Sequence, residues 1–280
     1  MRTLVIKLAG IVDDDSLPRL GELKMSITPV SGQSTQAFFI GANEPVTLEI
    51  IGDGTFTENG TKKLELGVVS NKRVEVSNGT FNLSILNKEA VTRLSFFEDY
   101  SHRFNSGLNL SQLRTMKNLT YLDTELGGVS GNVEDICGLT NLNFLKLNGG
   151  NIRGDMRLIG ENLVNLRIFQ NISTNVGVVT STFSNLTQIA DLRLLQVGGS
   201  SPLSDLSSLA TLTRLEMSYA GQGDISALAG LTNLTYLVLQ NNTRITGSTS
   251  SLAALHPNNG GKLATFTYGN TGITGTWPPS

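Results

Sequence analysis

The sequence predicts a mostly β solenoid of the α/β class, whose parallel sheet lines a concave side, preceded by a small, all-β, sandwich-like domain. Two observations indicate this fold. From residue 116 onward, leucines recur in units of nearly constant length. Before residue 89, short β-rich runs alternate with clusters of turn-forming residues. We therefore divide the chain into a β-rich N-terminal domain, residues 1–88, and a solenoid, residues 89–280.

The composition narrows the possible classes of protein. Apolar residues make up 39% of the chain, which is enough for a sizeable core, and charged residues only 16%. A net charge of −2 provides no long-range attraction to nucleic acid or to an anionic membrane. No apolar run approaches the roughly 20 residues that a membrane-spanning helix needs. We therefore expect neither nucleic acid nor a membrane as a partner.

Seven β-rich runs predict a small antiparallel sandwich in the first ninety residues. They cover residues 3–9, 23–28, 36–40, 46–51, 63–69, 73–76 and 80–86. The first run is not a secretory signal, because Lys7 interrupts its apolar residues; either the protein is made without a signal peptide or one has been removed. Two interpretations remain open: a distinct β domain that also caps the repeat array, or irregular strands of the solenoid itself. In both cases we expect an attachment module, with possible homo- or hetero-assembly through it.

A leucine-bearing unit repeats along the second part of the chain. Subtracting neighbouring starts gives steps of 23, 24, 23, 23, 22 and 29 residues, the last lengthened by an insertion at residues 256–261. A degenerate earlier unit lies near Val91. Each unit should supply one short parallel strand, and stacked units should share a continuous core. The aligned starts are Met116, Leu139, Leu163, Leu186, Leu209, Leu231 and Gly260.

The clearest unit, residues 231–247, reads LTNLTYLVLQNNTRITG. Its leucines and Asn242 fall at the spacing L-x-x-L-x-x-L-x-L-x-x-N, which resembles the leucine-rich repeat family. The Ile-x-Gly segments at Ile152, Ile245 and Ile273 are similar to plant-type repeats, which implies a short second sheet on the flank. The asparagine of the consensus is present only at Asn242, so we expect the other turns to use glycine or water instead.

The residues that could carry chemistry do not form a catalytic or metal-binding pattern. His102 and His256 both lie in predicted loop insertions, whereas a metal site or a Ser-His-Asp triad needs a positioned histidine. The single cysteine, Cys137, cannot form an internal disulfide and is interpreted as a small buried residue rather than a nucleophile. Aspartates 13–15 are adjacent, so they cannot all face one calcium ion. We expect no enzyme activity, no cofactor and no metal.

The concave face of the predicted sheet is the candidate binding site. Tyr121, Phe144 and Ile168 fall in one column on successive strands and should form a contiguous apolar patch. We expect these side chains to contribute to binding and not to folding, because the core lies on the other face. The predicted binding residues are Tyr121, Asp123, Phe144, Lys146, Ile168, Gln170, Arg193 and Tyr236.

The alternative interpretation of this face is a solvated ladder without a ligand. In that case its charges would only form ion pairs between neighbouring strands. The pairs that the register predicts are Asp123–Lys146, Asp191–Arg214 and Arg193–Glu216.

The predicted function is a non-enzymatic interaction, adhesion or structural role, with a protein or a cell-surface glycan as partner. The loose consensus and the β-rich lead-in resemble leucine-rich repeat proteins of gut Bacteroidetes-like bacteria and their phages. This resemblance implies a phage particle or a bacterial surface as the setting. The lack of a visible signal peptide favours a component of the phage virion that contacts assembly partners or a host surface. A secreted bacterial surface adhesin is the alternative. A carbohydrate-active enzyme would need paired carboxylates in a cleft, and Asp123 and Glu125 have no evident pocket.

Overall fold

The computed structural model describes residues 21–30, 35–77, 79–96, 104–125, 128–149, 151–177, 180–197, 199 and 201–278. The predicted strand over residues 3–9, aspartates 13–15 and His102 lie outside these ranges. In the part of the chain that is described, no helix is long and apolar enough to cross a membrane.

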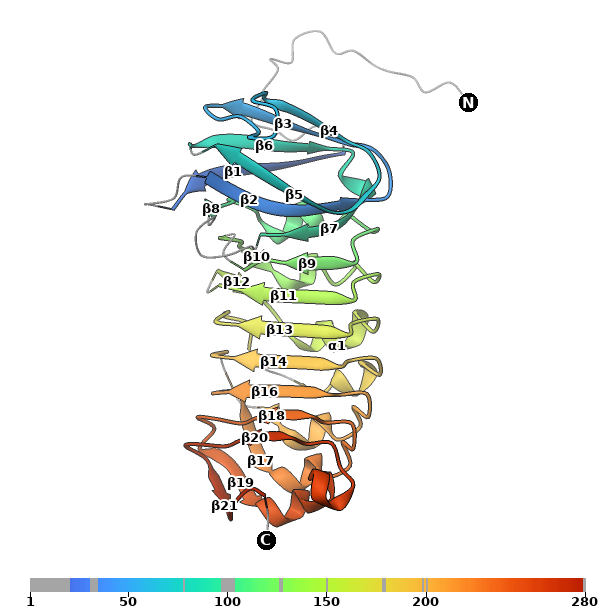
Figure 1. The fold of residues 1–280 in the computed structure, drawn as a ribbon, viewed down its shortest axis with the longest axis vertical. Coiled ribbons are helices and arrows are strands. Elements are labelled where there is room, and N and C mark those ends of the chain that lie inside the picture. The colour runs from blue at the N-terminus through green and yellow to red at the C-terminus, as the bar shows by residue number, and fades with distance from the viewer. Residues whose placement is uncertain are drawn as a thin grey trace.

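Eight parallel strands, one from each repeat unit, form most of a ten-stranded sheet (Figure 1). The unit near Val91 supplies the first of them. Neighbouring strands pair without a shift in register, so that Leu122, Leu145 and Phe169 lie opposite one another. The predicted mostly β solenoid is thereby confirmed. Its strands are β7 (Val91–Ser95), β9 (Tyr121–Asp123), β11 (Phe144–Asn148), β13 (Ile168–Ile172), β14 (Asp191–Leu195), β16 (Arg214–Ser218), β18 (Tyr236–Val238) and β20 (Thr265–Thr267).

The ten-stranded sheet continues past the first repeat into the N-terminal region. Strand β2 (Thr35–Ala42) pairs antiparallel with β7, and β5 (Val69–Ser77) follows at the sheet edge. These two strands therefore cover the edge that β7 would otherwise present. A second sheet, in the order β4-β3-β6-β1-β8, lies at this end of the molecule (Figure 1). Its strands are β1 (Glu22–Pro29), β3 (Val46–Gly52), β4 (Lys63–Leu66), β6 (Phe81–Leu86) and β8 (Phe104–Asn105).

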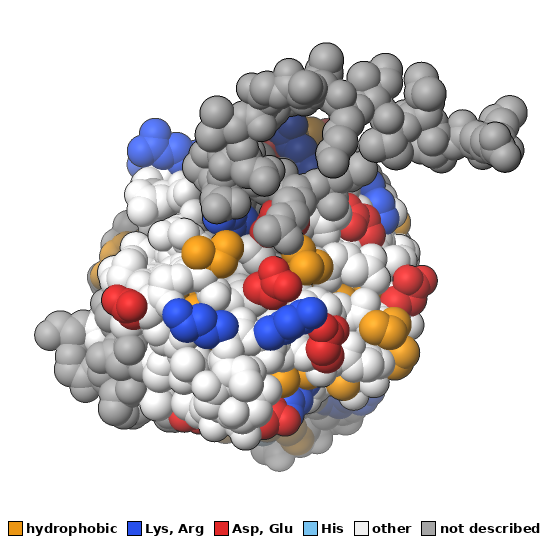
Figure 2. All heavy atoms as spheres, turned by 90° about the horizontal axis from the view of Figure 1, so that it is seen from above, with side chains coloured by type: hydrophobic (Ala, Val, Ile, Leu, Met, Phe, Trp, Pro, Cys, Tyr) orange, Lys and Arg blue, Asp and Glu red, His pale blue; other side chains and the backbone are white. Residues whose placement is uncertain are grey.

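One apolar core runs through both parts of the chain. Leu23 and Phe38 of the N-terminal strands belong to the same buried cluster as Leu94 and Leu122 of the first repeats. The backbone pairing between β2 and β7 and between β1 and β8 also crosses the predicted boundary after residue 88. A separate domain over residues 1–88 remains a prediction. Viewed from this end, acidic and basic side chains are interspersed on the described surface (Figure 2).

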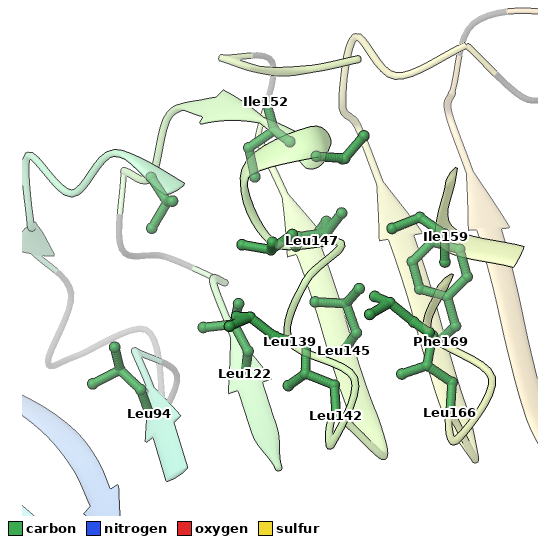
Figure 3. Close-up of a cluster of buried hydrophobic side chains, with 14 of the residues drawn as sticks. Leu94, Leu122, Leu139, Leu142, Leu145, Leu147, Ile152, Ile159, Leu166 and Phe169 are labelled. Atoms are coloured by element: carbon green, nitrogen blue, oxygen red, sulfur yellow. The ribbon is translucent and has the colours of Figure 1, made fainter. Parts of the chain in front are cut away.

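Leucines of successive coils fill the solenoid interior. Figure 3 shows Leu122, Leu145 and Phe169 extending from neighbouring strands to the same side of the sheet. Leu139 and Leu142, which precede strand β11, pack against them, and all five side chains are fully buried. Fully burying such a side chain stabilises the fold by about 1.5–3 kcal/mol, and stacking lets each coil bury the face of the next.

Short helices close the far side of each coil, and only one in the described part of the chain is an α-helix. That helix has only six residues, which is too short for a helix to be stable without packing against the rest of the fold. The helices are η1 (Lys88–Ala90), η2 (Leu110–Leu113), η3 (Val133–Asp135), α1 (Arg157–Asn162), η4 (Phe183–Asn185), η5 (Leu203–Leu206), η6 (Ile225–Leu228), η7 (Thr249–Leu255) and η8 (Pro257–Asn259).

The Ile-x-Gly segments pair as short parallel sheets on the flank, as the plant-type resemblance implied. Gly247 has φ +112°, a conformation that side chains other than glycine rarely adopt, which explains the glycine of the motif. One flank sheet joins β10 (Gly131–Asn132) to β12 (Ile152–Arg153), and the other joins β15 (Ser201–Pro202), β17 (Gly221–Asp224), β19 (Arg244–Ser248) and β21 (Gly272–Thr274).

Side-chain amides hold neighbouring coils together at two levels. Asn242 is buried; its Oδ1 accepts hydrogen bonds from the backbone N–H groups of Ala220 and Gly221, and its Nδ2 donates to the carbonyl of Met217. Where the asparagine is missing, Thr271 donates to the Tyr268 carbonyl in its own coil. Threonine thus replaces the amide there, an option that the sequence prediction of glycine or water did not include.

A second amide ladder explains the asparagine that directly precedes a leucine in four of the repeat units. Each of these side chains donates through Nδ2 to a backbone carbonyl of the preceding coil, at 2.8 Å. Because these bonds recur at the repeat period, they fix the stacking of one coil on another. The donors are Asn118, Asn141, Asn165 and Asn233.

Candidate functional site: the outward face of the parallel sheet

The outward face of the parallel sheet, which we call the sheet face, carries two full columns of side chains in strand register. All eight predicted binding residues lie on it. Tyr121, Phe144, Ile168 and Tyr236 stand in the first column together with Arg93, Asp191 and Arg214. The second column contains Ser95, Asp123, Lys146, Gln170, Arg193, Glu216 and Val238.

Three side chains at the N-terminal end of the first column stack on one another. The Tyr121 and Phe144 rings are parallel within 9°, with centroids 3.9 Å apart. On the other side of Tyr121, the guanidinium carbon of Arg93 lies 3.4 Å from the ring centroid. Stacked rings and a cation over a ring each contribute on the order of 1 kcal/mol. The expectation that Tyr121 and Phe144 contribute nothing to folding is therefore wrong, because the side chains bury one another.

The stack also determines which parts of the Tyr121 and Phe144 rings a partner can contact. Both faces of Tyr121 are covered, by Arg93 and by Phe144, so its ring meets solvent through its edge. Burial raises the pKa of the Tyr121 hydroxyl, and the neighbouring Asp123 carboxylate adds to this rise. The hydroxyl therefore stays protonated at neutral pH and can donate a hydrogen bond.

A second cation lies on a ring at the other end of the column. Arg214 stands with its guanidinium carbon 3.8 Å from the Tyr236 centroid. The same guanidinium donates to the Glu216 carboxylate at 2.9 Å. Tyr236 and Arg214 are thus held in place before any ligand arrives, which lowers the entropy lost on binding.

The ion pairs of the sheet face differ from those predicted. Arg193 donates to Asp191, and Arg214 donates to Glu216, each within one strand. The predicted pairs Asp191–Arg214 and Arg193–Glu216, which would join neighbouring strands, are wrong. Residues two apart on a strand share a face, and the long arginine side chain reaches its carboxylate along the strand. The ammonium of Lys146 bonds to Glu125 on the neighbouring coil.

Asp123 lies in the second column but is almost inaccessible, with 4% of its surface exposed. Loss of solvation raises the pKa of its carboxyl to about 6, against the opposing effects of the backbone N–H of Glu125 and the Lys146 ammonium. Gln170 is similarly buried, at 6% exposure. These two predicted binding residues therefore pack beneath the sheet face and offer little surface to a partner.

The remaining candidates occupy structural positions. The buried Cys137 thiol donates to the Val133 carbonyl, and burial raises the pKa of the thiol to about 12, so that it is not a nucleophile at neutral pH. His256 Nδ1 accepts from the backbone N–H of Asn258, and its ring packs against that of Trp277 in a T-shaped arrangement. Among the described residues, no three or more His, Cys, Asp or Glu side chains are grouped so as to hold a metal ion.

A feature that the sequence prediction missed is an aromatic residue at the rim of the sheet. Tyr219 follows strand β16 with φ +58° and 55% of its surface exposed. A hollow of about 170 Å³ beside it is also lined by Asn241, Thr243 and Arg244. The repeat alignment contained a signal: the equivalent positions of neighbouring coils hold the polar residues Gln196 and Asn241.

Comparison with known proteins gives likenesses of the fold only. No protein-family model matches the chain, and no curated protein matches it. Similar solved structures include internalin C2 of Listeria monocytogenes, with 22% identity, a TM-score of 0.44 and coverage of 67% of this chain and 83% of the internalin. The leucine-rich repeat ectodomain of the Arabidopsis receptor kinase HAESA has 22% identity and a TM-score of 0.47, over 61% of this chain and 29% of its own.

A leucine-rich repeat protein of Leptospira interrogans is also similar, with 18% identity and a TM-score of 0.42, over 59% of this chain and 40% of its own. The chain therefore spans well under half of the plant and leptospiral structures. The assignment of the repeat rests on the register of this chain itself: one parallel strand for each leucine-bearing unit.

Proposed function

We propose that the protein is a non-enzymatic interaction module that binds a protein partner on the sheet face between β9 and β14. The observation that carries the proposal is the row of half-buried apolar side chains in the first column, Tyr121, Phe144 and Ile168. Ile172 and Leu195, paired with each other at the strand ends, extend the apolar area. A contiguous apolar area on an open face is typical of a protein-binding surface.

The neighbouring charges favour a partner with its own apolar anchors. Arg193 and Arg214 are already paired with carboxylates, so neither presents a free charge that would select an ionic ligand. Apolar side chains that become fully buried when the partner binds, with such paired polar groups around them, are typical of the centres of protein interfaces.

The same geometry disfavours a glycan on this face. A sugar ring stacks on the open face of an aromatic side chain, and Tyr121 and Tyr236 each have a face covered by an arginine. Phe144 is covered on one side by Tyr121. Of the two partner classes expected from the sequence, a protein is therefore the one that we propose here.

A selection from a displayed peptide library, followed by calorimetry, tests the proposal. Ile168→Glu places a charge in the apolar row and should weaken binding of the selected peptides at least about tenfold. Val164→Glu is the matched control, because Val164 is 40% exposed and precedes β13 instead of lying on it. Failure to select any peptide, or equal affinity of the two variants, would contradict the proposal.

The biological setting that we propose is adhesion or assembly, in a phage particle or on a bacterial surface. The β strands before residue 88 would dock to the assembly, and the sheet face would meet the host or partner. Mass spectrometry of purified phage particles and of washed cell surfaces distinguishes the two settings. Absence from both would contradict the proposal.

A further inference from the structure

The rim of the parallel sheet carries a row of residues in the left-handed conformation, one after each of the strands β13, β14, β16, β18 and β20. Five described coils place one there, 23, 23, 22 and 29 residues apart, all with φ between +52° and +60°. Most have short polar or amide side chains, which tolerate this conformation comparatively well. The row consists of Ser173, Gln196, Tyr219, Asn241 and Asn270.

Tyr219 departs from this row. A bulky side chain in the left-handed region is a conformational outlier, because its Cβ crowds the neighbouring backbone there. The fold does not require tyrosine there, because serine, glutamine and asparagine serve in the other coils. Strain that the fold does not require is a reason to look for a function at the residue.

The ring of Tyr219 is free to receive a ligand. It is 55% exposed and, unlike the rings of Tyr121, Tyr236 and Tyr268, it has no aromatic or cationic partner among the residues that the structure describes. Beside the ring lies the hollow of about 170 Å³. This space suits one ring-sized group, since sites for larger ligands have volumes of about 300–1,000 Å³.

The other walls of the hollow supply hydrogen-bond donors and a positive charge. Within the described part of the chain, the exposed guanidinium of Arg244 has neither an ion pair nor a hydrogen bond. Asn241 Oδ1 accepts from Asn270, which leaves the NH₂ group of Asn241 available, and the Thr243 side chain is exposed. Buried Asn242 forms the base, with its amide engaged by the backbone.

We propose that this hollow binds a single acidic sugar residue, a hexuronate, through its carboxylate, its hydroxyls and the C–H face of its ring. Arg244 pairs with the carboxylate in the planar geometry that guanidinium groups favour. Asn241 and Thr243 bond to ring hydroxyls, and the flat apolar side of the sugar covers Tyr219. An aspartate or glutamate side chain would pair with Arg244 but leave the Tyr219 ring exposed to solvent. A sugar contacts both, so it fits the hollow better. The site is separate from the protein-binding area proposed for the sheet face.

Saturation-transfer NMR and calorimetry on the whole chain test this site. The probes are the methyl glycosides of glucuronic and galacturonic acid, with methyl glucoside as the neutral match and N-acetylglutamate amide as the acidic side-chain mimic. At least one uronide should bind, with saturation transferred from aromatic protons to the sugar ring protons. Arg244→Gln should weaken binding about tenfold or more, as expected for the loss of a charged hydrogen-bond partner.

Two further variants separate the contribution of the tyrosine ring from that of an exposed arginine elsewhere. Tyr219→Asn, which places at this position the residue found at Asn241 and Asn270, should fold and lose both the ring contact and the affinity. Arg153→Gln removes an exposed arginine from the other flank sheet and should bind like the wild type. The proposal is overturned if neither uronide binds, if the glucoside or the glutamate mimic binds as tightly, or if Arg153→Gln and Arg244→Gln behave alike.

Discussion

The ring of Phe144 lies flat on the ring of Tyr121 although the two residues are 23 positions apart and belong to different coils. Their strands pair in register, so the coil that carries β11 places Phe144 directly over Tyr121 of the coil before it. This stack lies on the outward face of the sheet and also stabilises the packing of one coil on the next. We therefore expect changes here to affect stability as well as binding.

A double-mutant cycle should measure the stack. We expect Tyr121→Leu and Phe144→Leu each to lower the free energy of unfolding by about 1 kcal/mol, with a coupling of about 0.5–1.5 kcal/mol between them. Urea unfolding of the four proteins gives this coupling. Additive effects would mean that the two rings do not stabilise each other.

Asp123 should make stability depend on pH. Its pKa is raised from 3.8 to about 6 in the fold, so the folded state holds the proton more tightly than the unfolded state. As the pH rises from about 4 to 6, the unfolded state ionises first, and stability falls by an amount on the order of 2–3 kcal/mol. Below that window both states are protonated and the effect is absent. Unfolding titrations at several pH values check this.

Asp123→Asn should remove most of that dependence. The amide is neutral at every pH, and its oxygen can still accept from the backbone N–H of Glu125. We expect the variant to be more stable than the wild type at pH 7 and nearly equal to it at pH 4. A variant that is less stable at pH 7 would show that the carboxylate is stabilised by its neighbours.

Tyr219→Asn should raise stability by about 1 kcal/mol, because asparagine relieves the positive-φ strain of tyrosine. The reciprocal change, Asn241→Tyr, should lower stability by a similar amount, since Asn241 has φ +60°. Differential scanning calorimetry compares the two melting temperatures. Equal effects of the two changes in the same direction would rule out backbone strain as the cause.

Among substitutions in the turns, Asn242→Ala should lower the free energy of unfolding most. It leaves the N–H groups of Ala220 and Gly221 and the carbonyl of Met217 without partners in a buried place. Each orphaned group costs about 1–3 kcal/mol, so we expect a loss of roughly 3 kcal/mol or more. Asn141→Ala is the control: it removes a single exposed bond and should cost about 1 kcal/mol or less.

The repeat period was sufficient to predict the strands, their register and the inward residues. Leu145 and Leu192, for example, lie where the spacing placed them, because leucines at a constant period admit only one stacking. The connection between the N-terminal strands and the array was not predictable. The pairing of β2 with β7 joins residues more than forty positions apart, and no local pattern in either strand specifies its partner.

For the candidate site, the sequence was sufficient to predict which residues share a column of the outward face, but not which side chains contact one another. The alternation of strand residues assigned Phe144 and Lys146 to the outward face. Which carboxylate each cation meets depends on side-chain reach, as with Arg193 and Asp191, and burial of Asp123 depends on the size of its neighbours. The Tyr219 hollow depends on a backbone angle and on the separate strand β19, neither of which the repeat consensus reveals.

Hydrogen–deuterium exchange with a selected peptide or captured partner bound is the most direct test of the proposed binding surface. We expect slower exchange in β9, β11, β13 and β14, at residues 121–123, 144–148, 168–172 and 191–195. Exchange in the N-terminal sheet and in the last coil should stay unchanged. Protection confined to the N-terminal strands or to the rim at Tyr219, with the four central strands unaffected, would contradict it.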